Sequence, residues 1–167
     1  MASRATSTIG LLLDGAMAGA AATWLMGKVT SYLYAHESQR VRQREDSARS
    51  GATAYEVAAE KIAGIAGRTL SKEQEQRYGE RIHWALGVGT GAAYSLLRDR
   101  VPAAALANGL LFGTAFFLLM DEVLVYALGL TPGPSNFPWQ THARGLAGHL
   151  TFGVATDGAL SLLRGHA

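Results

Sequence analysis

Four long runs of apolar residues alternate with more polar segments along the chain. They cover residues 9–34, 82–97, 103–128 and 142–163. About 20 apolar residues let a helix cross the hydrocarbon core of a bilayer. The pattern therefore predicts an all-α fold, a polytopic membrane helical bundle in which four transmembrane helices form two tandem hairpins.

Residues 35–80 differ from these runs, because they hold eight Lys/Arg and eight Asp/Glu. Ser50-Gly51 breaks any continuation of the first helix, which could otherwise extend through residues 40–49. Thr53 with Glu56, and Ser71 with Gln74, have the spacing of capping boxes that open helices. We therefore expect an extramembrane helical insert, whose apolar stripe packs on the bundle, lies at the lipid interface or binds a partner.

The last half of each predicted hairpin carries a repeated sequence. His83–Arg98 reads HWALGVGTGAAYSLLR, and His149–Arg164 reads HLTFGVATDGALSLLR. A weaker match relates Leu25-Met26 to Leu119-Met120. Because each unit crosses twice, the copies share one orientation and should be related by a pseudo-two-fold axis along the membrane normal.

Composition fits a single membrane domain, residues 1–167. Apolar residues make up 49%, charged residues 17%, and the 20 glycines favour close helix packing. There is no cysteine, so disulfides and thiolate sites are excluded, and a net charge of +2 does not favour nucleic acid. No hydrolase, kinase or zinc-protease signature occurs, so we do not expect an enzyme.

Charge in the short connections predicts the orientation. Arg4, Arg98, Arg100 and Arg164 fall on one side, and the opposite loop, residues 131–141, has no Lys or Arg. The positive-inside rule then places both termini in the cytoplasm. The rule does not decide which side the insert at 35–80 faces.

Ionisable residues within the predicted spans form two layers, about 12 Å apart from the helical rise. Such residues are costly in lipid and need a partner or a task. The outer layer holds Lys28, His83, Glu122 and His149, and the inner layer holds Asp14 and Asp157.

Three interpretations of these layers remain open. His83 and His149, at equivalent repeat positions, could bind a haem or, with Glu122, a metal ion. Alternatively, a proton or ion path could run through Asp14, Lys28, Glu122, His149 and Asp157. The third interpretation is structural: Lys28 pairs with Glu122 and the polar layer fixes helix register.

A series of short motifs extends over residues 80–164. They are His83 with Tyr94, Gly109-Leu-Leu-x-Gly113, Gly129-Leu-Thr-Pro132, Pro138-Trp139, Gly148-His149-Leu150 and Asp157. This order resembles the YagU-like family of small bacterial inner-membrane proteins. The resemblance implies a multi-pass protein of the bacterial inner (plasma) membrane, and it carries no catalytic residues with it.

The sequence thus predicts an integral membrane protein whose principal partner is the lipid bilayer. It leaves open whether the chain forms a homo-oligomer or serves as an accessory subunit of a larger membrane complex, docked through residues 53–80. It also leaves open the transported species and whether any cofactor is bound.

Overall fold

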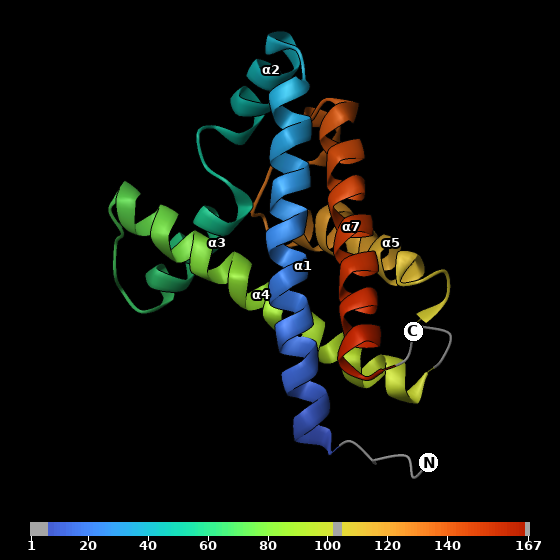
Figure 1. Cartoon of the computed structure of the whole chain (residues 1–167). Helices are drawn as coiled ribbons and strands as arrows, with labels where there is room; N and C mark the ends of the chain where they lie inside the picture. The colour runs from blue at the N-terminus through green and yellow to red at the C-terminus, as the bar shows by residue number, and fades with distance from the viewer. Residues whose placement is uncertain (1–6, 102–104, 166–167) are drawn as a thin grey trace.

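The computed structural model describes residues 7–101 and 105–165, among which no β-strand occurs, so the all-α prediction is confirmed. Figure 1 shows the helices in chain order. They are α1 (Thr8–His36), α2 (Gln39–Arg49), α3 (Ala54–Ile65), α4 (Lys72–Arg100), α5 (Leu110–Leu119), the π-helical turn η2 (Met120–Leu124), α6 (Val125–Ala127), the 3-10 turn η3 (Pro134–Asn136) and α7 (Trp139–Leu163).

Two long helices, α1 and α7, lie side by side along the length of the molecule (Figure 1). α4 crosses α1 obliquely, α5 packs on α7, and α3 packs on α4 to form an arm that projects to one side. The first turn of α1 and the last turn of α7 lie at the same end of the molecule.

Both predicted capping boxes are present. The Thr53 amide donates to Glu56 Oε2 at 2.8 Å, and the Ser71 amide donates to Gln74 Oε1 at 2.8 Å. From Ser71, α4 continues unbroken through the second apolar run, as expected. Gly67 has a φ of +67° beyond the end of α3, a conformation that glycine adopts without strain.

Two helix boundaries differ from the prediction. α1 stops at His36, and the Ser38 side chain caps a separate helix, α2, so residues 40–49 do not continue α1. α5 begins only at Leu110, because residues 105–109 form turns in which Ala107 and Asn108 have positive φ. The predicted start at Pro102 lies outside the described residues.

The described residues contain two helical stretches long and apolar enough to span a membrane, Thr8–His36 and Leu110–Ala127. The predicted spans at 82–97 and 142–163 do not reach that standard. The helices that contain them, α4 with 29 residues and α7 with 25, are long enough, but neither has an 18-residue stretch that is apolar enough. The four-span arrangement therefore goes beyond what helix length and composition support.

Glycine contacts allow the helices to cross closely. A Cβ on Gly91 would lie 2.4 Å from the carbonyl oxygen of Gly15 and 2.5 Å from the Cα of Gly19. A Cβ on Gly153 would meet the corresponding atoms of α5, at 2.3 Å from Gly109 O and 3.0 Å from Gly113 Cα. Gly15 and Gly19 have the GxxxG spacing that predicts close helix contact, and these distances confirm it. The α1–α4 and α5–α7 crossings use the same atoms.

Candidate functional site: an acid–histidine cavity

A polar cavity of about 220 Å³ lies beside η2 and α7. We call it the acid–histidine cavity and define it by the ionisable and hydroxyl side chains that line it: Arg49, Thr53, Tyr55, Asp121, Glu122, Tyr126, Thr131, Thr141, His142 and His149. Its volume is sufficient for several water molecules, each of which needs roughly 10–15 Å³.

The π-helical turn places two adjacent carboxylates in this cavity. The Val125 amide donates to the carbonyl of Met120, five residues back, instead of four. In a regular α-helix, neighbours point about 100° apart, and the sequence therefore indicated that at most one of Asp121 and Glu122 faces the seam. That expectation was wrong, because both residues line the cavity, each facing a different histidine of α7.

Glu122 pairs with His142 of α7. Glu122 Oε1 lies 2.6 Å from His142 Nδ1, and His142 Nε2 lies 3.2 Å from the carbonyl oxygen of Pro134. The carboxylate oxygen accepts, so Nδ1 supplies the hydrogen of the 2.6 Å contact. Both ring nitrogens of His142 therefore face oxygen acceptors.

Asp121, in contrast, faces His149. The His149 ring is buried, and its Nδ1 donates to Gly145 O at 3.0 Å, so the neutral ring carries its hydrogen on Nδ1. Asp121 Oδ2 lies 3.6 Å from the same nitrogen, beyond hydrogen-bond distance. The ring edge packs against Phe116, with centroids 5.0 Å apart.

Two hydroxyl groups complete the cavity wall. Burial, together with the charge of Asp121, raises the pKa of Tyr55 to about 12, so this phenol stays protonated at neutral pH. Thr131 Oγ1 is buried and makes no hydrogen bond among the described residues. A buried hydroxyl without a protein partner needs water or a ligand as its partner, and the cavity is large enough for water.

His83 and His149 both line a second, smaller cavity of about 80 Å³. His83 stacks on Tyr55, with ring centroids 4.9 Å apart. The volume is well below the roughly 300 Å³ at which small-molecule and cofactor pockets begin. The two histidines therefore do not fit a haem between them.

The two histidines also differ in their helix packing. A Cβ on Gly113 would lie 2.4 Å from the carbonyl oxygen of His149, and one on Gly19 would lie 2.5 Å from that of Gly87. His149 therefore takes the packing position of Gly87 rather than that of His83, one helical turn away. The predicted equivalence of the two histidines is not realised in these crossings.

The metal set inferred from the sequence, His83, Glu122 and His149, is not assembled. Glu122 is bonded to His142 instead. Across residues 7–101 and 105–165, no three His, Asp or Glu side chains are grouped so that they could hold a metal ion.

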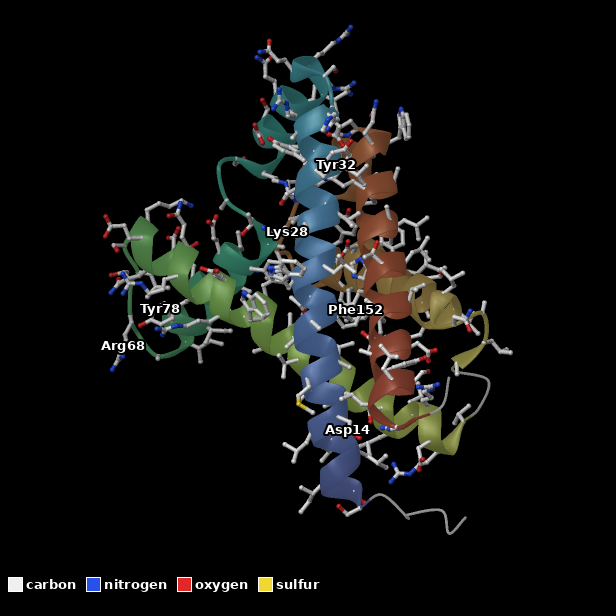
Figure 2. All side chains as sticks on the ribbon, viewed as in Figure 1. Asp14, Lys28, Tyr32, Arg68, Tyr78 and Phe152 are labelled. Carbon is white, nitrogen blue, oxygen red and sulfur yellow. The ribbon has the colours of Figure 1, made fainter. Side chains whose placement is uncertain are left out.

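Lys28 does not pair with Glu122. Its side chain is exposed on the outer side of α1, where Nζ lies 5.6 Å from the ring centroid of Trp24 (Figure 2). Trp24 is one turn earlier on the same helix, so the ammonium has a local aromatic partner and remains in contact with the surroundings.

The remaining predicted path residues, Asp14 and Asp157, are paired with arginines outside the acid–histidine cavity. Asp157 is buried, accepts from the Tyr94 hydroxyl at 2.7 Å, and lies 3.1 Å from Arg98 Nε. Asp14 lies 3.6 Å from Arg164. Of the five predicted path residues, only Glu122 and His149 line the cavity. Contacts with arginines that tie separate helices together indicate a structural role for this cluster.

A buried ion network between α2 and α7 was not foreseen from the sequence. From its place in the first turns of the last predicted helix, Arg144 is expected to reach interfacial water. It is instead 9% exposed and binds the carboxylates of Glu37 and Glu45. Glu45, in turn, is 2% exposed and also binds Arg49 at 2.7 Å. Burial of the Glu45 carboxyl opposes ionisation, but hydrogen bonds from Arg144 and Thr141 and the charge of Arg49 outweigh it and lower its pKa. One part of this network had a signal in the sequence: Glu45 and Arg49 are four residues apart, a spacing that lets opposite charges pair on one helix.

Comparison with protein-family models, with curated proteins and with solved structures returns no match. The proposed function is therefore based on the geometry of the site and the arrangement of the helices.

Proposed function

We propose that the chain is a small multi-pass membrane protein that binds protons in the acid–histidine cavity and passes them along α7. The observation that supports it best is the 2.6 Å contact between Glu122 and His142, a carboxylate and an imidazole that line one cavity. A second acid–histidine pair, Asp121 and His149, lines the same cavity. His149 lies about two helical turns after His142 on α7. Chains of acidic and histidine side chains with water are typical of proton pathways in membranes.

The distribution of side-chain size along α1 supports a lipid environment. Small residues point inward, since Gly15, Ala18 and Ala22 are buried. Large apolar side chains point outward, and Leu13 and Trp24 are 60% and 57% exposed. Exposed apolar surface of this extent is unfavourable in water and is satisfied by acyl chains.

The proposal includes four crossings, two of them made by α4 and α7. The common end of α1 and α7 is consistent with an even number of crossings. The duplicated hairpin, the cytoplasmic termini and the likeness to the YagU-like inner-membrane family belong to the same proposal. The similar glycine crossings of α1–α4 and α5–α7 favour the duplication.

Proton flux in liposomes tests the function directly. The full chain is reconstituted with an internal pH-sensitive dye, and a potassium gradient with valinomycin drives proton entry. We expect flux in the native chain and its loss in Glu122→Gln, which keeps the shape of the side chain but removes the ionisable group. Glu73→Gln, an exposed change in the first turn of α4, is the matched control and should retain native flux.

Two results would overturn the proton function: a native chain without flux above empty liposomes, or equal flux in Glu122→Gln and Glu73→Gln. Circular dichroism of each reconstituted variant confirms that loss of flux does not reflect loss of helical structure.

A further inference from the structure

A third hollow, an apolar groove, lies between α3 and α4, the two helices of the projecting arm. Its volume is about 460 Å³, and it is separate from the acid–histidine cavity. We call it the arm groove; it is lined by Ala59, Ile62, Ala63, Ala66, Arg68, Leu70, Tyr78, Arg81, Ile82 and Ala85. The only charged residues in this lining are Arg68 and Arg81. The groove thus combines an apolar surface with a cationic edge.

The cationic edge is not neutralised by the protein. The Arg68 side chain makes no ion pair or hydrogen bond among the described residues, and it lies on the arm near Tyr78 (Figure 2). The Arg81 guanidinium lies 5.4 Å from the ring centroid of Tyr78. Guanidinium groups bind phosphate oxygens through paired N–H donors, so this edge is suited to a phosphate ester.

The outer surface of α3 continues the apolar character of the groove. Ile62 and Ile65 are 60% and 89% exposed, although both are large aliphatic residues. On a helix with charged neighbours, such side chains are typical of the boundary between lipid and water. In the proposed membrane location, which the two candidate spans support, acyl chains are the apolar material available to the arm.

We propose that the arm groove binds one anionic phospholipid, with an acyl chain along the apolar residues and the headgroup phosphate on Arg68 and Arg81. The amphipathic lining favours this occupant over a soluble anion, which would leave the apolar surface exposed to water. It also favours lipid over an acidic peptide, whose backbone polar groups would find no partner in the alanine- and isoleucine-rich lining. The site does not depend on the proton function.

Native mass spectrometry of the full chain in mild detergent tests the proposal. Phosphatidylglycerol and phosphatidylcholine of identical acyl composition are titrated separately, and the fraction of protein with one retained lipid is measured. We expect the anionic lipid to be retained preferentially by the native chain. The double variant Arg68→Ala/Arg81→Ala should bind it about 30-fold more weakly, from about 1 kcal/mol per basic residue at an anionic lipid surface.

Two further variants separate headgroup recognition from general charge and from folding. Arg77→Ala/Arg100→Ala removes two exposed arginines of α4 outside the groove and should bind as the native chain does. Ala63→Phe fills the apolar part of the groove and should weaken retention of both lipids. Because Ala63 borders the groove, the added ring has space and the fold is retained.

The proposal is overturned if the native chain retains both lipids equally, or if the two double variants lose the anionic lipid to the same extent. Retention of inorganic phosphate or of an acidic peptide in the groove, with no preference for the anionic lipid, would also overturn it. Loss of lipid with normal proton flux would support the groove and leave the proton function intact, so the two proposals fail separately.

Discussion

Replacement of Gly91 by alanine is the most direct test of the helix arrangement. The added methyl group would lie 2.4 Å from Gly15 O and 2.5 Å from Gly19 Cα, both backbone atoms of α1. Neither atom can rotate away, unlike the end of a flexible side chain. α1 would have to move by about 1 Å before the contact reached an ordinary van der Waals distance.

The expected cost combines two opposing effects. Overpacking of a close contact costs about 1–3 kcal/mol, whereas alanine gains about 1 kcal/mol over glycine in helix propensity. Gly89 lies on the same helix, but a Cβ there would meet nothing within 4 Å. Gly89→Ala therefore gains the propensity alone, and the difference between the two variants isolates the packing cost, about 1–3 kcal/mol.

Unfolding of the detergent-solubilised chain by sodium dodecyl sulfate, followed by circular dichroism, measures both variants. We expect Gly89→Ala to unfold at or above the native midpoint and Gly91→Ala to unfold below it. The reasoning is refuted if Gly91→Ala is as stable as Gly89→Ala, because the α1–α4 crossing could not then be as close as described.

The α5–α7 crossing should respond in the same way: Gly113→Ala, which directs its methyl group onto a backbone carbonyl at 2.4 Å, should be about 1–3 kcal/mol less stable than Gly158→Ala, which meets nothing within 4 Å, in the same assay. Arg144→Met should cost about 3–5 kcal/mol in the free energy of unfolding, because it leaves the Glu45 carboxylate buried without its main partner; equal stability to the native chain would contradict the buried network. The pKa of Glu45 is lower in the folded chain than in the unfolded chain, so its contribution is complete above about pH 4.5 and is lost as pH falls through the folded pKa. Unfolding midpoints measured from pH 6 to pH 3 should therefore decrease more steeply for the native chain than for Glu45→Gln.

The starts of α3 and α4 could be predicted from the sequence, because each carries a known capping pattern. Thr53 with Glu56 and Ser71 with Gln74 satisfy the first amides of α3 and α4 from within four residues. Such contacts depend on the local sequence, so the spacing alone is sufficient. The GxxxG spacing of Gly15 and Gly19 was informative for a similar reason, because it requires only that a partner backbone approach that side of the helix.

Contacts between distant segments were not predictable in this way. Arg144 and Glu45 are 99 residues apart, and the sequence around each of them looks like that of an ordinary exposed charged residue. Burial becomes evident only when α2 folds back onto the start of α7. The five-residue hydrogen bond of η2, the turn that carries Asp121 and Glu122, likewise has no sequence signature.

The one-turn difference between sequence repeat and packing explains why the chemical site is asymmetric. The sequence alignment pairs Gly87 with Gly153, but the contacts pair Gly91 with Gly153, because each would direct a Cβ at the same three backbone atoms of its partner helix. A shift of four residues is close to one helical turn, so it preserves the glycine face and moves every other side chain by about 6 Å along the axis. His149 is thereby placed beside η2 and Asp121, whereas His83 packs on Tyr55 of the arm. The register of the α5–α7 glycine contacts is thus the one that brings an imidazole to the carboxylates.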